Sequence, residues 1–304
     1  MTSFDPSDSD PTTPMRPTTP SRREADDWAL VLIAEGIESK VVRVEAGFSV
    51  RVAESDAAAV REILDSWRSE RIERSRRLAL PPARGATALE TTLAYAFALT
   101  MLAFHLGLEA SGRWTDFIDL GKSQAALVLE GQWWRLLTAL TLHADLTHVL
   151  GNTLFGGFFL SAVAGRLGVG IAVLAFVVTG TLGNLANALY YGSAHNSIGA
   201  STGVFGLVGV LAGLAAWQRH QTALPGRGAW VALGAALAIV AMLGSGGGRV
   251  DFSAHLFGLA AGGLTGLLIA APVAGRPRPN PFVQGLAAAT ALAMILVAWL
   301  YAQP

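Results

Sequence analysis

Residues 199–206 read GASTGVFG, and they place a Ser-Thr pair inside a stretch that is otherwise apolar enough to sit in lipid. The apolar character continues to about residue 217, which comes close to the ~20 residues that a membrane-spanning helix needs. The stretch therefore predicts a membrane helix that carries a serine, Ser201, near its start. It also raises the question of which other residue could activate that hydroxyl.

The whole chain has the composition of a membrane protein. Of its 304 residues, 52% are hydrophobic and only 14% are charged, whereas an ordinary soluble domain has about 25% charged residues. Residues 1–90 hold 13 of the 22 Lys and Arg and 16 of the 22 Asp and Glu, so a soluble head precedes a lipid-embedded body. The formal net charge of +0 argues against a nucleic-acid surface. The absence of cysteine excludes disulfides, thiolate nucleophiles and Cys-ligated metals.

The soluble head divides into two parts. Residues 1–27 are polar, acidic and rich in Pro, Ser and Thr, and we expect a disordered tail without a signal peptide. Residues 28–80 predict a small cytoplasmic α/β module, an appendage without chemistry of its own, whose helix has Ser55 as its expected N-cap. Turns are expected at Gly36 and Gly47. The expected strands are ALVLIAEG, VVRVEAG and SVRVAE, at 29–36, 41–47 and 49–54.

Seven later stretches are apolar over lengths that suit membrane helices. Arginines gather in the connections on one side, which the positive-inside rule makes cytoplasmic. We therefore expect the N-terminus in the cytoplasm, the C-terminus outside, and helices 2, 4 and 6 running inward from the outer face. The seven stretches are 88–108, 148–165, 169–190, 200–217, 229–244, 253–273 and 283–302.

Four polar residues share one depth in this arrangement. His148, Asn152, Ser201 and His255 each lie within the first two turns of an inward-running helix. At 1.5 Å per residue, this places them roughly 3–9 Å below the outer helix ends. Ionisable side chains inside a bilayer are costly and usually face a partner or a cavity. Three helices that bring polar groups to one level therefore predict a functional site.

These residue types suit nucleophilic attack on a carbonyl group. A serine hydroxyl is a weak nucleophile until a base takes its proton, and His255 is the expected partner of Ser201. The attack creates an oxyanion that needs fixed donors. His148 and Asn152, four residues apart on one helix face, can both donate, as can the Ser201 N–H at a helix N-terminus.

The base and the nucleophile can meet only if their helices approach closely. Gly258 and Gly262 follow His255 with the small-xxx-small spacing that permits such an approach. Phe205 lies one turn after Ser201, where its ring could pack on the His255 imidazole and restrict its rotamer.

The lipid-embedded body resembles the rhomboid intramembrane serine proteases over about residues 88–273. The resemblance rests on GQWWRLLTALTLHADLTHVLGN, IGASTGVFGLVG and FSAHLFGLAAG, in that order. It implies an all-α polytopic membrane protein with a six-helix catalytic core and one additional transmembrane helix at 283–302. It also implies cleavage of single-pass membrane proteins near the outer face. The composition, rich in Ala, Gly and Arg and without a transit peptide, predicts multi-pass insertion in a bacterial plasma (inner) membrane. The implied partners are these substrates and the lipid bilayer, with no nucleic acid, metal or cofactor.

The resemblance also implies roles for single residues. Ser201 matches the nucleophile and His255 the base of a Ser-His dyad, while His148 and Asn152 match the oxyanion-binding pair. The family's usual motif has glycine directly after the serine, but this chain has Thr202 there, which puts a branched side chain beside the oxyanion site. The residues that match supporting positions are Gly199, Phe205, Gly258, Gly262, Trp134 and Arg135.

Each of these residues has a simpler explanation when it is taken alone. Ser201 could bond the carbonyl four residues back or join two helices. His148 and Asn152 could form a structural hydrogen-bonded pair. Arg135 could pair with Glu130 or with a lipid phosphate. Only the common depth of the four polar residues favours catalysis over these explanations.

Other functions are less well supported. A catalytically silent relative that binds membrane proteins is the main alternative. A transporter would need acids near the midplane, whereas Asp145 and Asp251 lie at the outer edge. A zinc site would need HExxH or cysteines. We expect a dyad without a third carboxylate, with Asp251 at most orienting His255 from outside. The histidines at segment ends, to which we assign no catalytic role, are His105, His143, His195 and His220.

Overall fold

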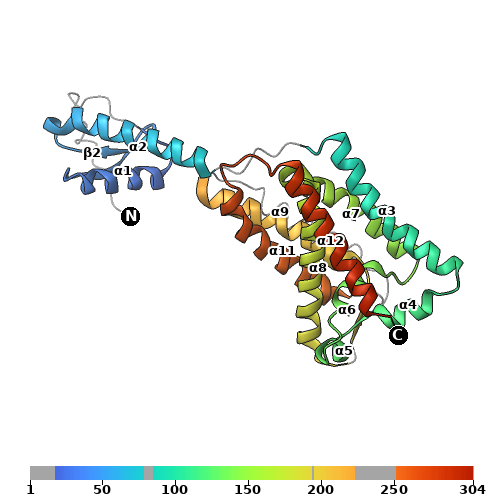
Figure 1. Cartoon of the computed structure of the whole chain (residues 1–304). Helices are drawn as coiled ribbons and strands as arrows, with labels where there is room; N and C mark the ends of the chain where they lie inside the picture. The colour runs from blue at the N-terminus through green and yellow to red at the C-terminus, as the bar shows by residue number, and fades with distance from the viewer. Residues whose placement is uncertain (1–17, 79–84, 194, 223–233, 235–250, 304) are drawn as a thin grey trace. The chain divides into compact units, whose positions relative to one another are not determined.

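The computed structural model describes residues 18–78, 85–193, 195–222, 234 and 251–303 (Figure 1). The chain forms two compact units, residues 1–77 and 78–304, which are described separately below. The expected membrane helix at 229–244 lies, apart from residue 234, outside the described residues.

The N-terminal unit consists of two helices and a hairpin (Figure 1). Strands β1 (Lys40–Val44) and β2 (Gly47–Arg51) pair in antiparallel fashion, with Val44 opposite Gly47 across the turn. Helices α1 (Arg22–Ala34) and α2 (Ala57–Leu78) share a hydrophobic core with this hairpin. The largest of its fully buried side chains is that of Trp28.

Three expectations for this unit were wrong. Residues 29–36 were expected as a strand, but most of them belong to α1, because Ala25, Trp28, Ala29 and Leu32 form one buried helical face. The boundary at residue 28 was too late, since α1 begins at Arg22 with Ser21 as its N-cap. Ser55 lies in a 3-10 turn before α2 and bonds Asp56 instead of capping α2.

The second unit is mostly helical and contains six helices that are long and apolar enough to cross a membrane, counted over the described residues. Six of the seven expected stretches are thereby confirmed as helices. Their bounds are α3 Ala88–Ala110, α7 Leu146–Leu167, α8 Val169–Tyr191, α9 Ser201–Thr222, α11 Phe252–Val273 and α12 Pro281–Tyr301.

The connection between α3 and α7, residues 111–145, has a structure of its own. A two-residue strand, β3 (Ser123–Gln124), pairs with β4 (Asn196–Ser197) just before α9. The connection therefore reaches the segment that leads to Ser201. Its short helices are α4 Trp114–Gly121, α5 Ala125–Leu129 and α6 Arg135–Thr138, followed by a 3-10 turn at Ala139–Thr141.

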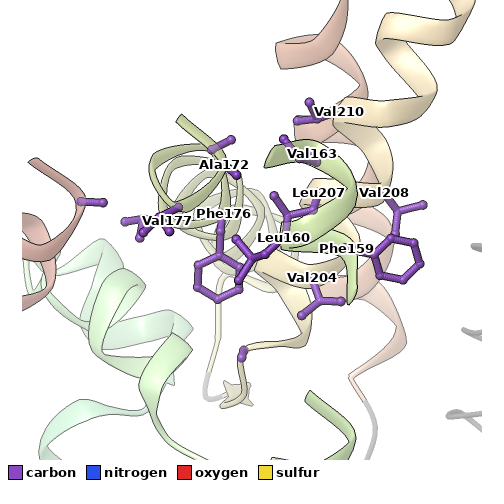
Figure 2. Packing of buried hydrophobic residues seen from close by; sticks show 14 of the residues in the cluster. Phe159, Leu160, Val163, Ala172, Phe176, Val177, Val204, Leu207, Val208 and Val210 are labelled. Atoms are coloured by element: carbon purple, nitrogen blue, oxygen red, sulfur yellow. The ribbon is translucent and has the colours of Figure 1, made fainter. Parts of the chain in front are cut away.

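The core of the second unit lies between α7, α8 and α9 (Figure 2). Phe176 of α8 is almost completely buried, and Leu160 of α7 and Leu207 of α9 are buried with it. In lipid, helices are held together by close van der Waals packing, because the tails are as apolar as the side chains. This core fixes α9, and therefore Ser201, against two neighbouring helices.

Helices α9 and α11 approach each other backbone to backbone. Three glycines of α11, spaced four residues apart, lie against three backbone carbonyl groups of α9 with the same spacing. A Cβ atom at any of these glycines would collide with the facing carbonyl oxygen. The small-residue spacing in the sequence therefore permits this backbone-to-backbone contact between α9 and α11. The facing pairs are Gly258 with Thr202, Gly262 with Gly206, and Gly266 with Val210.

The C-terminal helix α12 runs alongside α8 (Figure 1). At its beginning, the Gln284 side chain accepts a hydrogen bond from the Ile171 N–H at 3.1 Å and donates one to the Leu167 carbonyl at 2.8 Å. Gly168 and Gly170 leave room for this residue, since a Cβ at either position would collide with Gln284. A single glutamine thus fastens α12 to the junction of α7 and α8.

The other end of α12 contacts the α3–α7 connection. The Trp299 Nε1 donates to the Thr141 hydroxyl at 3.1 Å. The ring of Tyr301 lies 5.2 Å from that of Trp133 and is stacked with that of Trp134. The additional helix therefore supports the same connection that reaches the segment before Ser201.

Candidate active site

Ser201 and His255 are in hydrogen-bond contact. The Ser201 Oγ lies 2.7 Å from the His255 Nε2, and the two residues are only 7% and 5% exposed. Ser201 is the first residue of α9, and His255 lies one turn into α11. The contact is possible because the glycines after His255 let the two helices come together. A serine that donates to an unprotonated imidazole nitrogen is arranged for proton transfer.

The His255 ring is held on one face by Phe205. The two rings are stacked, with centroids 4.6 Å apart and planes inclined by 27°. Phe205 is buried and lies four residues after Ser201 on the same helix face. The second ring nitrogen of His255, Nδ1, is buried and has no hydrogen-bond partner among the described residues. No carboxylate of the described residues therefore hydrogen-bonds this nitrogen.

The segment that enters α9 is fixed by the α3–α7 connection. The Gly199 N–H donates to the Ala139 carbonyl at 2.9 Å, and the Ala200 N–H donates to the His143 Nε2 at 3.3 Å. Gly199 has φ +128°, a conformation that residues with a side chain rarely adopt. These contacts set the direction in which the chain presents Ser201.

His143 is a supporting residue that the sequence did not reveal. It is 1% exposed. Burial is the main cause that lowers its pKa to about 3, and electrostatic repulsion from His148 and His105 also contributes. His143 is therefore neutral at pH 7, which leaves its Nε2 free to accept the Ala200 N–H. Within the described residues, no group of three or more His, Asp or Glu side chains could hold a metal ion. No local sequence pattern predicts the bond between His143 and Ala200, because these residues are 57 positions apart.

His148 lies beside the segment that leads to Ser201, and Asn152 follows His148 by one turn on α7. A Cβ atom at Gly199 would lie 2.8 Å from the His148 Nε2 and 3.5 Å from the Ser201 Oγ, so both groups border the same glycine. Asn152 is 7% exposed, and its Nδ2 is buried with no partner among the described residues. Buried polar groups are normally bonded. The Asn152 amide, one turn after His148, is therefore an unbonded donor that an incoming oxygen could accept from.

His195, for which the sequence predicts no catalytic role, bonds Asp251, the residue one turn before His255. Its Nε2 lies 2.8 Å from the Asp251 Oδ2, and its ring stacks on that of Tyr191. Burial alone would raise the pKa of Asp251, but hydrogen bonds from His195, Ser253 and the Ala254 N–H more than offset it and lower the pKa. Asp251 is therefore ionised at neutral pH, and it does not contact His255 through its side chain.

Trp134 and Arg135 have structural contacts within the α3–α7 connection. Arg135 is 7% exposed and donates to the carbonyls of Asp119 and Lys122, both at 3.0 Å, and to the Gln132 side chain at 2.7 Å. It therefore holds this connection together, and the suggested pairing with Glu130 is replaced by these contacts.

The branched side chain at Thr202 has space because two neighbouring helices have glycine there. A Cβ atom at Gly183 of α8 would lie 2.6 Å from the Thr202 Cγ2, and one at Gly258 would lie 3.1 Å from it. Thr202 is 2% exposed. Its methyl group thus occupies the junction of α8, α9 and α11.

The chain is similar to rhomboid proteins. Residues 130–272 match the family model of the Rhomboid domain. The rhomboid protease GluP of Bacillus subtilis is 31% identical over 218 residues, which cover 69% of this chain and 40% of that protein. YdcA of the same organism is 29% identical over 174 residues, covering 56% of this chain and 83% of that protein. RHOMBOID-like protein 7 of Arabidopsis thaliana is 34% identical over 148 residues, covering 47% and 45%. The chain thus spans less than half the length of GluP.

Proposed function

Because the chain belongs to the rhomboid family, we propose that it is an intramembrane serine protease that cleaves single-pass membrane proteins near the outer face of the bilayer. The observation that carries the proposal is the 2.7 Å contact between the Ser201 Oγ and the His255 Nε2. A catalytically silent relative would have no need of a buried, hydrogen-bonded pair of this kind. The buried setting also suits a reaction from which bulk water is largely excluded.

In the first step, Ser201 attacks the carbonyl carbon of the scissile bond. The His255 Nε2 accepts the hydroxyl proton as the bond from Oγ to carbon forms. The imidazolium then gives this proton to the leaving amine, and water hydrolyses the acyl-enzyme. Because Nδ1 of His255 has no partner among the described residues, the pair acts as a dyad. The stacked Phe205 ring supports the imidazolium through its π face.

The negative charge of the tetrahedral intermediate needs hydrogen-bond donors. The Asn152 Nδ2, the His148 ring and the Ser201 N–H are the candidate donors. The unbonded state of the Asn152 Nδ2 and the position of the His148 ring beside Gly199 support this assignment. Donors that are fixed before the reaction avoid the cost of reorganisation, and each one typically contributes about 10²- to 10³-fold to kcat.

A helical substrate hides its carbonyl groups in hydrogen bonds and must unwind before Ser201 can attack. We therefore expect substrates whose membrane segment has Gly or Pro near the outer face, because these residues weaken the helix. One transmembrane substrate should be compared in two versions, with Gly-Ala or Leu-Leu at the same position. Equal cleavage of both versions would contradict the expected preference.

The labelling of Ser201 by a fluorophosphonate probe tests the proposed chemistry directly. We expect the full-length protein to be labelled, and Ser201→Ala and His255→Ala to lose labelling. Ser161→Ala is the matched control, because Ser161 is also a serine of a membrane helix but bonds only the Gly157 carbonyl. A wild-type protein without a Ser201-dependent adduct would contradict the proposal.

The orientation proposed from the positive-inside rule places the N-terminal unit in the cytoplasm and the C-terminus outside. The protein is expected in the plasma (inner) membrane. This places the beginnings of α7, α9 and α11, and the reacting pair with them, toward the outer face. A reporter that is active only outside the membrane should respond when it is fused after residue 303 and stay silent when it is fused to the N-terminus.

A further inference from the structure

The Asp251 carboxylate joins three parts of the membrane unit. Its Oδ2 accepts from the His195 Nε2 and the Asn187 Nδ2, both at 2.8 Å. Its Oδ1 accepts from the Ser253 hydroxyl at 2.7 Å and from the Ala254 N–H at 3.1 Å. Asn187 belongs to α8, His195 to the segment before α9, and Ala254 to the first turn of α11. We call Asp251, Asn187 and His195 the Asp251 latch.

The latch connects the two segments that carry the reacting pair. His195 precedes Ser201 by six positions, and Asp251 precedes His255 by four. The His195 carbonyl accepts the Ala125 N–H at 2.9 Å, and β4 then pairs with β3, so the segment between His195 and Ser201 is held at several points. The N-cap bond from Ala254 to Asp251 holds the first turn of α11 in the same way.

The latch and the glycine contacts hold α11 on both sides of His255. Gly258 fixes the distance between α11 and α9 about one turn after His255. Before His255 there is only one turn of helix, because α11 begins at Phe252. The end of a helix frays unless its free N–H groups are bonded. Without the latch, the first turn of α11 would lose its bonds to His195 and Asn187 and would keep, among the described residues, the 3.1 Å bond between the Ser253 and Tyr191 hydroxyls.

Resting on the proposed function, we propose that Asp251, through His195 and Asn187, is a positioning residue that holds the His255 imidazole against Ser201. Its side chain hydrogen-bonds neither the His255 imidazole nor the Ser201 hydroxyl, and it takes no part in proton transfer. It differs from the third carboxylate of a triad, because it acts through the start of α11 and the segment before α9. Two of its bonds, to His195 and Asn187, come from outside α11 and are the ones that set the position of the helix.

The test measures kcat and KM of the full-length protein in liposomes on one transmembrane substrate. Asp251→Asn keeps the size of the side chain but leaves one oxygen for four donors. His195→Ala removes the donor from the segment before α9. We expect each variant to lower kcat about 10- to 100-fold, as for a misplacement of about 1 Å, with KM within about twofold of wild type. His195→Gln should restore most of kcat, because its amide nitrogen can donate to Asp251.

Arg278→Gln is the matched control. Arg278 and Glu90 form an ion pair of the same length, 2.8 Å, with similarly low side-chain exposure of 15% and 18%, against 26% and 14% for His195 and Asp251. This pair joins α3 to the segment before α12 and contacts neither Ser201 nor His255. We expect Arg278→Gln to lower the unfolding temperature and to leave kcat unchanged. A kcat at the wild-type level in Asp251→Asn or His195→Ala, a loss confined to KM, or no rescue by His195→Gln would overturn the latch.

The positioning role of the latch and the proposed protease activity can be disproved separately. If the wild type shows no Ser201-dependent labelling, the proposed function fails, and hydrogen exchange then decides on the latch. Asp251→Asn should increase exchange of the amides at 197–201 and 253–256, while Arg278→Gln should not. Unchanged exchange in Asp251→Asn would overturn the positioning role, whatever the activity of the protein.

Discussion

The burial of the Asn152 side chain indicates what kind of hydrogen-bond partner it takes. Its amide nitrogen is buried and unbonded among the described residues, and leaving a buried donor unsatisfied costs about 1–3 kcal/mol. A protein carries that cost where a ligand supplies the missing acceptor. Under the proposed function, the oxygen of a tetrahedral intermediate formed at Ser201 is that acceptor.

Replacing the amide of Asn152 with a carboxylate tests this interpretation. We expect Asn152→Asp to lower kcat by about 10²-fold or more with little change in KM, because the isosteric side chain has lost its donor. Steady-state kinetics on a transmembrane substrate provide the measurement. Thr153→Ser, at the next position, is the control and should retain wild-type kcat. A full retention of kcat in Asn152→Asp would remove Asn152 from the oxyanion site.

His143 should make the protein sensitive to mild acid. The folded protein keeps this ring neutral down to a pKa of about 3, whereas the unfolded chain takes up the proton near 6.5. The unfolded state therefore binds more protons between these values, and the free energy of unfolding falls by about 1.4 kcal/mol for each pH unit of acidification. His143→Gln can still accept the Ala200 N–H without titrating, and its unfolding temperature should depend less steeply on pH. Parallel pH dependences for the two proteins would contradict this account.

The contact between Ser201 and His255 was expected from the sequence, as were the packing of Phe205 on His255 and the close approach at Gly258, but the contacts of His143 and His195 were not. Ser201, His255, His148 and Asn152 each stand in the first turns of an apolar helix, so a rule about depth was enough to group them. His143 and His195 lie in connections, where depth cannot be read from hydropathy. Their partners, Ala200 and Asp251, are 57 and 56 positions away. Only the folded arrangement of three connections brings these pairs together.

At the scale of whole elements, the packing of α8, α9 and α11 explains how the structure accommodates the threonine side chain that follows Ser201. The Thr202 methyl group lies where Gly183 and Gly258 have no side chain. The departure from the family's motif is thus matched by the glycine at 183 on another helix. The two positions should be energetically coupled, because they share one small space.

A double-mutant cycle measures this coupling. Gly183→Ala should lower the free energy of unfolding by about 1–3 kcal/mol, since its Cβ would meet the Thr202 Cγ2 at 2.6 Å. Thr202→Ser removes that methyl group, so the double variant should recover part of the loss. The recovery is incomplete because the new Cβ also meets the Gly258 Cα at 2.8 Å. Strictly additive effects in thermal or denaturant unfolding would show that the two positions are independent.

The elements differ in how well their sequence predicts them. Six membrane helices were found because each holds about 20 apolar residues, a length that few other structures require. Helix α1 was mistaken for a strand because the apolar run from Trp28 hides its period. The helical spacing becomes visible only when Ala25 and the Ser21 cap are included. The short helices of the α3–α7 connection depend on distant contacts, such as the bond from the Trp114 Nε1 to the His143 carbonyl at 3.0 Å.

At the scale of the whole membrane unit, Gln284 should matter for stability and not for chemistry. Its side chain bonds the Ile171 N–H and the Leu167 carbonyl, so Gln284→Ala leaves two backbone groups without their partner. We expect a loss of about 1–3 kcal/mol in the free energy of unfolding and unchanged kcat at a temperature where the variant is folded. Gln303→Ala is the control, because the exposed Gln303 bonds only the Trp299 carbonyl of its own helix. A selective loss of kcat in Gln284→Ala would mean that α12 affects the reacting pair directly.

The contacts of α12 also have a consequence for biosynthesis. Trp299 bonds Thr141, and Ala139 two residues earlier accepts the Gly199 N–H that leads to Ser201. A ribosome synthesises the chain from its N-terminus, so Ser201 and His255 are made before Trp299. Every newly made molecule therefore passes through an interval in which Ser201 has been synthesised but Trp299, which bonds Thr141, has not. A pause in translation between α11 and α12 would lengthen that interval.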